Sequence, residues 1–552
     1  MMTALRRTRA YQTLRHWRHL LGSSRYRASD REARAAFRRF CQQEGGLGLR
    51  HDLRPRGCAP KTALIVRNIS LPYAKIEAVV MKALQMAGFE TIVFGNREYG
   101  FLRYDWLAGN RTGFTPWDFG VDGDGQWVDQ QLARLAGLQD WLGLEYDGVH
   151  VGRFVIASAL RALKVGQLDF ADPSVQARLR GTLESSVRTA RAAARLLEEL
   201  KPNCAVFLDR GYSGQGEVFD LAIQKGIEVL VWNLGYKSDR LVLKRYHRGN
   251  QRDHPLTPSA ATWRQLCAMP WSPEYGRRVR DELFQCYDAQ DWFSVVGTQF
   301  GKAILSRETT RHKVGLSCDK KVAVVFPHIL WDGSFFFGED LFDDYTQWLV
   351  ETIRAAAANP RLQWVVKLHP AHLVKARQWN DPGKPAEVRA IEAAFGHLPA
   401  HVKLVPPDTE LSTYSLFEIA DYVVTVRGTV GMEAALFGIP VVTAGTGRYD
   451  RRGFTLDSST REEYLAKLAT LETAPRLSPE QVERAERYAY GVLFCRPLPL
   501  SSVSLDYARD GKATPKLTIH CRTRQEWLDA PDMQQLAGWI AEMTEDMMVW
   551  PA

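Results

Sequence analysis

The chain has 552 residues, a formal net charge of +9 and eight cysteines. This length predicts about two to four domains, and the apolar fraction of 45% is ample for sizeable cores. No stretch approaches the roughly 18 to 20 apolar residues that span a bilayer, and the N-terminus lacks the apolar core of a signal peptide. The cysteines show no CxxC or Cys/His pairing at metal-ligand spacing. We therefore expect a cytoplasmic protein with reduced thiols and without a metal site.

The positive charge is concentrated in an N-terminal arm, residues 1–58. Residues 1–56 contain fourteen arginines and four acidic residues, whereas the rest of the chain is almost neutral. Apolar residues recur among these arginines at helical spacing: Ala10, Leu14, Trp17 and Leu21. This pattern is typical of a basic helix at an anionic membrane surface. The alternatives are a helix that packs on its own domain and a nucleic-acid-binding arm, but no motif that reads nucleic acid is present. We predict docking on a membrane or a partner protein and no binding of nucleic acid.

Residues 59–270 indicate a first α/β domain. Four apolar runs are expected strands: residues 62–69, 91–95, 204–209 and 228–233. Helical patterns between successive runs predict crossover helices and thus a parallel sheet. An irregular insert, residues 100–173, is too long for a simple connection. We interpret it as a substrate-shaping element, with a surface subdomain as the alternative. Residues 271–317 are helical and polar and form the expected bridge to the next domain.

Residues 318–490 repeat the alternation. The expected strands are residues 321–329, 364–370, 401–405, 421–426 and 440–444, and the expected helices are residues 343–358, 386–396, 412–420 and 430–437. The pattern predicts a second doubly wound sheet, followed by a helical return segment, residues 491–552. The predicted fold class is thus α/β, with two facing Rossmann-like domains and a basic helical arm. Ligands of such sheets bind beyond the carboxyl ends of the strands. Distinctive residues sit at these ends of the expected strands: His328, Asp332, Lys367, His369, Pro370, Arg427 to Gly431 and Gly445 to Arg448.

One strand–turn–helix–strand unit, VTVRGTVGMEAALFGIPVVTAGTGRY, is typical of a phosphate site. The turn Gly428-Thr429-Val430-Gly431 places a flexible backbone and a hydroxyl where a helix begins, so free N–H groups and the positive end of the helix dipole point outward. Glu433, in the first helical turn, is placed to accept hydrogen bonds from a ribose diol. The alternative is an ordinary αβ unit whose glycines permit tight packing.

Three segments resemble a known family. WVVKLHPA, the long segment from DTELSTYSLFEIADYVVTVRGTVGMEAALFGIPVV to EEYLAKL, and RYAYGVLF are similar to the C-terminal half of bacterial capsule polysaccharide biosynthesis proteins. Those proteins are similar to GT-B glycosyltransferases, in which the second of two Rossmann-like domains holds most of a nucleotide-sugar donor. The resemblance covers residues 320–500 well and the first half only in its αβ outline. An HP dipeptide followed 58 residues later by GTxGxEAxxxGxPVV is a more specific signal than HP alone.

The resemblance also implies roles for single residues. His369 and Pro370 match the HP motif that meets the donor phosphate, Thr429 and Gly431 match the small-residue turn, and Glu433 matches the ribose contact. Electrostatics supports these roles, because a leaving phosphate needs hydrogen-bond donors and helix N–H groups can supply them without a metal. The neighbouring residues also expected to bind the donor are His328, Lys367, Arg427, Gly428 and Arg448. Relatives often have Lys or Ser where this chain has Thr429-Val430, which leaves the exact donor open.

An acceptor hydroxyl must lose its proton during transfer, so a base is expected near the strand ends. Asp209 lies at a strand terminus before a glycine-rich turn, and Asp332 lies on the loop after the second domain's first strand. Either is a candidate catalytic base, although Asp209 can instead cap a helix and Asp332 can hold its loop. His247 and His254, in the expected basic loop KRYHRGNQRDHP, are weaker candidates, and that loop can instead steer an anionic glycan.

The sequence thus favours a glycosyltransferase that moves a sugar from a nucleotide-sugar donor onto a growing surface polysaccharide, with His369 and an aspartate as catalytic residues. The expected partners are that donor, a polysaccharide or lipid-linked acceptor, and an anionic membrane or capsule assembly proteins bound by the arm. No cofactor is expected, because the nucleotide sugar is a substrate. The alternatives are a nucleotide-sugar 2-epimerase and a non-catalytic capsule assembly or export subunit. The expected location is the inner face of the cell membrane.

Overall fold

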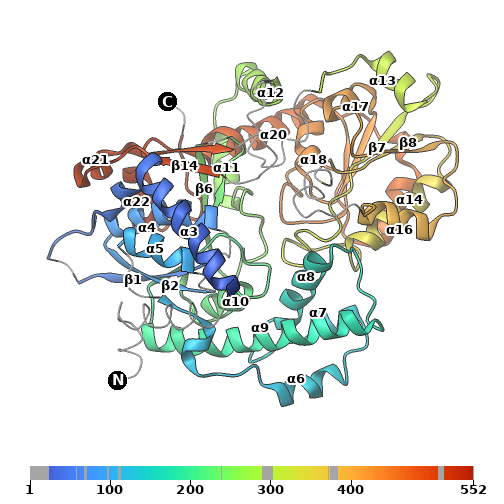
Figure 1. Ribbon diagram of the computed structural model, residues 1–552. Coiled ribbons are helices and arrows are strands. Elements are labelled where there is room, and N and C mark those ends of the chain that lie inside the picture. The colour runs from blue at the N-terminus through green and yellow to red at the C-terminus, as the bar shows by residue number, and fades with distance from the viewer. Residues whose placement is uncertain are drawn as a thin grey trace.

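The computed structural model contains two α/β units side by side (Figure 1). It describes residues 24–57, 59–67, 71–95, 99–109, 113–237, 239–288, 302–370, 372, 383–507 and 515–550.

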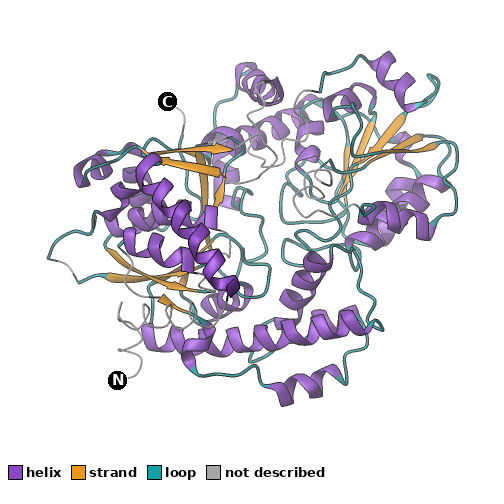
Figure 2. Cartoon of the chain, viewed as in Figure 1, coloured by secondary structure: helices purple, strands orange, loops and turns teal. Residues whose placement is uncertain are grey.

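The first domain is built on a seven-stranded sheet in the order β12-β6-β5-β4-β1-β2-β3. Figure 2 shows the strands of the protein in orange, with purple helices around them. Its strands are β1 (Lys61–Val66), β2 (Phe89–Phe94), β3 (Gly113–Phe114), β4 (Cys204–Phe207), β5 (Glu228–Leu234), β6 (Arg240–Tyr246) and β12 (Leu498–Pro499). The four strands expected from the sequence are present and parallel. However, β6 pairs antiparallel to β5, and β12 pairs antiparallel to β6, so the sheet is mixed rather than parallel.

The prediction of a basic loop is wrong at its start, because the first residues of that segment belong to strand β6. Lys244 and Arg245 are buried in β6 because acidic partners neutralise them. Lys244 Nζ lies 2.7 Å from a Glu545 carboxylate oxygen and 3.1 Å from an Asp546 carboxylate oxygen, and Arg245 Nε lies 2.6 Å from Glu228 Oε1. The carboxylates of the C-terminal segment thus allow a strand with charged side chains to be buried.

The insert is helical rather than irregular. The helices before β4 are α3 (Ser24–Gln43), η1 (Gly46–Arg50), α4 (Leu71–Met86), α5 (Tyr99–Leu107), η2 (Pro116–Phe119), α6 (Gly125–Leu132), α7 (Leu138–Leu142), α8 (Val151–Leu163) and α9 (Pro173–Leu200), and α10 (Gly216–Gln224) follows β4. Asp172 caps α9 by accepting hydrogen bonds from Ser174 N and Val175 N, with Pro173 in the first turn.

The second domain is built on a five-stranded parallel sheet in the order β11-β10-β7-β8-β9. Its strands are β7 (Val322–Val325), β8 (Gln363–Lys367), β9 (Val402–Val405), β10 (Tyr422–Thr425) and β11 (Val441–Thr443). Its helices are α14 (Tyr345–Ala358), α16 (Ala386–Ala394), α17 (Thr413–Ile419), α18 (Thr429–Ala435), α19 (Arg461–Ala469), η3 (Leu471–Thr473) and α20 (Pro479–Tyr490). The doubly wound sheet expected from the β-branched runs is confirmed. The point at which the strand order changes direction lies between β7 and β10.

The segments outside the two sheets connect them. The helices α11 (Ala260–Ala268), α12 (Pro273–Asp288) and α13 (Arg307–Val314) precede β7. After α20, a π-helical turn η4 (Gly491–Cys495) leads back to the first domain. The return segment is not only helical, because a hairpin of β13 (Val503–Tyr507) and β14 (Pro515–Ile519) precedes α21 (Arg524–Asp529) and α22 (Pro531–Ala541).

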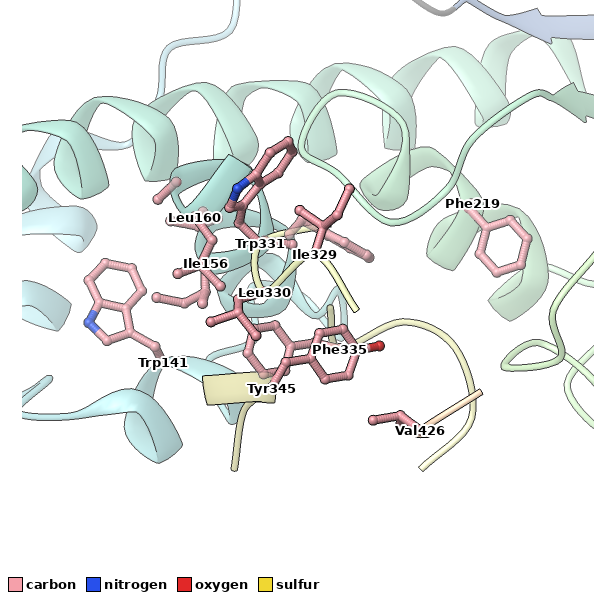
Figure 3. Close-up of a cluster of buried hydrophobic side chains, with 14 of the residues drawn as sticks. Trp141, Ile156, Leu160, Phe219, Ile329, Leu330, Trp331, Phe335, Tyr345 and Val426 are labelled. Carbon is pink, nitrogen blue, oxygen red and sulfur yellow. The ribbon is translucent and has the colours of Figure 1, made fainter. Parts of the chain in front are cut away.

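The insert joins the two domains through a shared apolar core. Trp141 of α7 and Ile156 and Leu160 of α8 belong to the same buried cluster as Leu330 and Trp331, which follow β7 (Figure 3). Polar contacts reinforce it: Gln139 Nε2 donates to Asp343 Oδ1 at 2.7 Å, and Gln167 Nε2 donates to Asp344 Oδ2 at 3.0 Å. The insert therefore fixes one domain to the other, in addition to any role in shaping a substrate site.

The described part of the arm packs on the first domain. In α3, Phe37 and Phe40 each place their ring 5.2 Å from the ring of Tyr104 in α5. Lys75 Nζ of α4 also lies 2.7 Å from Glu44 Oε2. The expected membrane-facing positions from Ala10 to Leu21 lie outside the described residues. In the described ranges, no helix combines the length and the apolar character needed to cross a membrane.

Candidate functional site

The carboxyl ends of β10, β7 and β8, which are neighbours in the sheet, bring three expected donor-site residues together. His328 follows β7, His369 follows β8 and Arg427 follows β10. The main-chain N–H of Arg427 donates to His328 Nε2 at 3.2 Å. His369 is close enough that its charge acts on His328. The prediction that distinctive strand ends converge therefore agrees with the geometry.

His328 is held in its neutral form. Burial, and then the charges of Arg427 and His369, lower its pKa to about 3. Its ring stacks on Tyr345 with 5.2 Å between centroids. Because Nε2 already accepts the Arg427 N–H, His328 can orient the strand ends but is poorly suited to donate a proton.

Arg427 is a buried anchor. Its guanidinium forms an ion pair with Asp340, and Nη1 donates to the Tyr345 hydroxyl at 3.3 Å. It is 3% exposed, so its two terminal nitrogens bind protein groups rather than solvent. These contacts fix the loop that carries Asp340 to the end of β10.

Arg448 links the expected donor site to the first domain. Its Nη1 donates to the Arg427 carbonyl at 2.9 Å, and its Nη2 donates to the Tyr236 hydroxyl at 3.0 Å. Tyr236 follows β5 of the first sheet. Arg448 is half-buried, so its cation lies at the domain boundary.

The glycine turn at the start of α18 differs in detail from its expected geometry. Gly428 is the N-cap residue and no side chain caps the helix. The Tyr449 hydroxyl donates to Gly428 O at 2.7 Å and lies against the Cα of Gly431, where a side chain would collide with it. Gly431 is therefore required for this close approach.

Glu433 is buried, at 3% exposure, and lies beyond the first turn of α18, which corrects the expectation of a first-turn acid exposed to a cleft. Burial raises its pKa to about 7, while the Thr429 and Tyr414 side chains favour the ionised form. Its Oε2 has no hydrogen-bond partner within the described residues. A buried carboxyl oxygen of this kind can accept a ligand hydroxyl.

The residues in and next to the HP motif differ sharply in exposure. His369 is exposed, whereas Pro370 and Lys367 are buried. Lys367 Nζ donates to Leu368 O at 2.9 Å, and burial, followed by the charge of Lys302, lowers its pKa to about 7. Of these three residues, His369 has the most accessible side chain for an entering phosphate.

The two candidate bases meet at the domain boundary around Arg161 of α8. Arg161 Nη1 lies 3.9 Å from Asp209 Oδ2, and its guanidinium lies 4.4 Å from the Tyr212 ring centroid. The Tyr212 hydroxyl donates to Asp332 Oδ1 at 3.0 Å and accepts from Gly333 N at 3.1 Å. Asp209 and Asp332, alternatives in the sequence, therefore belong to one cluster.

Asp209 is held by its own turn. Its Oδ1 accepts the main-chain N–H groups of Arg210 at 2.7 Å and Gly211 at 3.2 Å. Burial raises the pKa of Asp209, although Arg161 and these N–H groups favour the carboxylate. Its side chain remains 25% exposed, so the carboxylate is accessible.

Sequence reasoning missed Arg161 and Tyr212. Tyr212 had a local signal, because an aromatic residue stands inside the glycine-rich turn RGYSGQG next to Asp209. Arg161 had none, since an arginine on an amphipathic helix is normally a solvated residue. Within the described ranges, no three His, Cys, Asp or Glu side chains are grouped as a metal site requires.

Comparison with known proteins finds a family match for part of the chain. Residues 332–476 match the family model described as capsule polysaccharide biosynthesis protein. No curated protein shows significant sequence similarity to the chain.

Several solved structures overlap with this one at low similarity. The Thermosulfurimonas dismutans KpsC β-Kdo 2,4 transferase is 16% identical, with 57% of this chain and 84% of that chain covered and a TM-score of 0.33. MnaA of S. aureus, solved with UDP, is 12% identical, with 78% and 94% covered and a TM-score of 0.28. The UDP-GlcNAc 2-epimerase of Neisseria meningitidis, bound to UDP-GlcNAc, is 13% identical, with 78% and 95% covered and a TM-score of 0.23. Overlaps this weak identify neither a reaction nor a substrate.

The family match begins at Asp332 and includes the HP motif and the turn before Glu433. The resemblance expected from these motifs is thereby confirmed: residues 332–476 are similar to capsule polysaccharide biosynthesis proteins.

Proposed function

We propose that this protein is a glycosyltransferase of capsule polysaccharide assembly, which moves a sugar from a nucleotide-sugar donor onto a growing glycan. The observation that carries the proposal is a contact between the two domains: Asp332, whose charge acts on His328, accepts a hydrogen bond from Tyr212, three residues after Asp209. The second domain supplies an exposed histidine, His369, beside the neutral His328. The first domain supplies the carboxylate of Asp209, and Asp332 joins it across the boundary through Tyr212.

The second domain is the proposed donor side. His369 donates a hydrogen bond to the leaving phosphate, and the turn that begins at Gly428 lies near the neighbouring His328. Glu433 accepts from the ribose through its unpaired oxygen. Arg448, at the boundary, adds positive charge where the leaving phosphate becomes more negative. The nucleotide sugar is a substrate, and the proposed chemistry requires neither a cofactor nor a metal.

Asp209 is the proposed base. A general base is most effective when its pKa approaches the working pH, and burial moves the pKa of Asp209 in that direction. Asp332 is then a positioning residue, which accepts a hydrogen bond from the Tyr212 hydroxyl and sets the spacing of the two domains.

The test is product analysis of the purified full chain. A thermal-shift screen with CMP, UDP, GDP and CDP first identifies the nucleotide, since a compound at 100 times its Kd stabilises the fold by about 2.7 kcal/mol. The matching nucleotide sugar is then incubated with and without capsular oligosaccharide. Release of free nucleotide that depends on the oligosaccharide supports transfer. Conversion of the nucleotide sugar alone indicates a 2-epimerase, and failure to bind any nucleotide indicates a non-catalytic subunit.

A further inference from the structure

Glu387, in the first turn of α16, is an acidic residue whose side chain is fully buried. It is 0% exposed, and its two carboxylate oxygens contact different loops. Its Oε1 accepts the main-chain N–H of Leu330 at 3.1 Å. Its Oε2 lies 2.7 Å from Nε2 of His372, which is itself buried. Because burial of a carboxylate is costly unless its oxygens are paired, these two contacts explain why a carboxylate is tolerated here.

Both partners of Glu387 belong to loops that end at the candidate donor site. Leu330 stands two residues after His328 in the loop after β7. His372 stands three residues after His369 in the loop after β8, and its N–H donates to the His369 carbonyl at 3.3 Å. A single buried carboxylate thus joins the segment that carries His328 to the segment that carries His369.

The Leu330 end of this bridge is fixed by the insert. The Leu330 side chain belongs to the apolar core shared by the two domains (Figure 3). Gly166, after α8, approaches so closely that a Cβ atom in its place would collide with the Leu330 side chain. From the same helix as Glu387, Arg389 Nη2 donates to the Lys164 carbonyl at 3.1 Å. The loop after β7 is therefore restrained by the insert, and Glu387 extends this restraint to the loop after β8.

We propose that Glu387 and His372 are positioning residues, which set the place of His369 relative to His328 at the donor site. Both oxygens of Glu387 are engaged inside the protein, so its effect reaches the donor through the two loops rather than by contact. Displacement of a reacting group by about 1 Å can reduce a rate by about a hundredfold. The inference rests on the proposed function in one respect: it takes His369 to act on the leaving phosphate.

The first test compares variants of this bridge in the purified full chain. Glu387→Met removes both oxygens at similar length, His372→Phe keeps a ring without nitrogen, and a third chain carries both changes. Glu486→Met is the matched control. Glu486 is also a buried carboxylate between two partners, because it pairs with Arg280 and accepts from Trp271 Nε1 at 3.3 Å. It belongs to α20, so its loss should affect stability without displacing the donor-site loops.

Glu387→Met and His372→Phe should each lower kcat by about tenfold or more, with a smaller change in KM. The double variant should be no slower than the slower single variant, because either change alone breaks the bridge. Glu387→Gln should recover part of the loss, since an amide can accept from Leu330 N and donate to a neutral His372 ring. Glu486→Met should lose similar thermal stability and keep the kcat of the wild type.

The second test requires no turnover. Isotope-labelled histidine rings report the surroundings of each imidazole in two-dimensional NMR of the full chain. His328 lies at the other end of the bridge from His372, so His372→Phe should shift the His328 resonance. In the Glu387→Met chain the same change should no longer shift it, whereas a direct effect of the new ring would persist.

Two results would overturn the inference. The first is a kcat per folded molecule in both single variants that equals the value of Glu486→Met; if Glu387→Met does not fold, His372→Phe alone decides this comparison. The second is a His328 resonance that His372→Phe leaves in place, or shifts equally in the Glu387→Met chain. A chain that shows the coupled shift but no sugar transfer would contradict the proposed function alone.

Discussion

The Tyr212 hydroxyl and the Asp332 carboxylate lie 3.0 Å apart, on opposite sides of the boundary between the two domains. Tyr212 belongs to the turn after β4, and Asp332 belongs to the loop after β7. The same hydroxyl accepts the N–H of Gly333, so a single phenol holds two groups of the other domain. Its loss should affect the alignment of the domains more than the stability of either one.

Tyr212→Phe should lower kcat by about tenfold, because misplacement of reacting groups is costly even when each domain stays folded. The loss of unfolding free energy should be about 1 kcal/mol, typical of one hydrogen bond. Tyr464→Phe is the matched control: its buried hydroxyl is hydrogen-bonded to Trp348 and Thr352 within the second domain. That variant should lose similar stability and keep its turnover. Equal kcat values for the two variants would contradict the alignment role.

Asp209→Asn should reduce kcat by at least a hundredfold if Asp209 is the base, whereas Asp332→Asn should reduce it less. The pH profile gives a sharper test. A base must be deprotonated, so kcat/KM should fall as the pH drops through the pKa of Asp209. Burial raises this pKa, so the acid limb should lie above 3.8, the ordinary value for an aspartate. A profile whose acid limb survives Asp209→Asn but disappears in Asp332→Asn would exchange the two roles.

His369→Ala should lower kcat by about tenfold to a thousandfold with a smaller change in KM, since a donor to the leaving phosphate acts mainly in the transition state. His369 is exposed, so the variant should keep the melting temperature of the wild type. Steady-state kinetics and calorimetric melting on the same preparation measure both effects. A variant with normal kcat per folded molecule but reduced stability would show a structural histidine instead.

Glu433→Gln should change how stability depends on pH. Burial raises the pKa of Glu433 from 4.5 to about 7, so between these values the folded state binds a proton that the unfolded state releases. Glu433 therefore makes the free energy of unfolding fall as pH rises from 4.5 to 7, by at most about 3 kcal/mol. Relative to the wild type, Glu433→Gln should gain stability between pH 5 and pH 8 in urea unfolding.

An exposed acid of the same domain, Glu418, provides the control, and Glu418→Gln should follow the wild type from pH 5 to pH 8. If Glu433 also contacts the ribose, Glu433→Gln should weaken nucleotide binding in calorimetry. Unchanged nucleotide affinity would exclude the ribose role without affecting the stability argument.

The second sheet was predictable because its signals are local. Its strands are short β-branched runs with buried residues at almost every position, and each is followed by a helical pattern. The HP dipeptide and the glycine turn end two of these strands, so their convergence followed from the topology alone. The burial of Glu433 did not, because it depends on helix packing rather than on sequence spacing.

The first domain was harder to predict because distant residues stabilise it. The strand β6 contains Lys244 and Arg245, and the carboxylates of Glu545 and Asp546 that allow Lys244 to be buried lie about 300 positions further along the chain. Arg161 and Tyr212 likewise meet Asp332 only through tertiary packing. Local pattern reading cannot detect such partners, and these partners define the domain boundary.

The arm remains the basis for a membrane-docking prediction, although the structure changes how it should be tested. Removal of residues 1–56 would also remove Phe37 and Phe40, which pack on Tyr104. A truncation that begins at Ser24 retains α3 and still removes five arginines and no acidic residue.

Deletion of residues 1–23 should weaken co-sedimentation with anionic vesicles and spare turnover on a soluble acceptor. Each arginine near anionic lipid contributes roughly 1 kcal/mol, and salt reduces this attraction because the screening length shortens to about 8 to 10 Å at physiological ionic strength. The intact chain should therefore leave the vesicles as salt rises. Trp17→Ala should weaken binding at every salt concentration, because burial of an apolar ring at the interface is not screened. Neutral vesicles are the control. A truncated chain that sediments with anionic vesicles as the intact chain does would show that these residues are not the anchor.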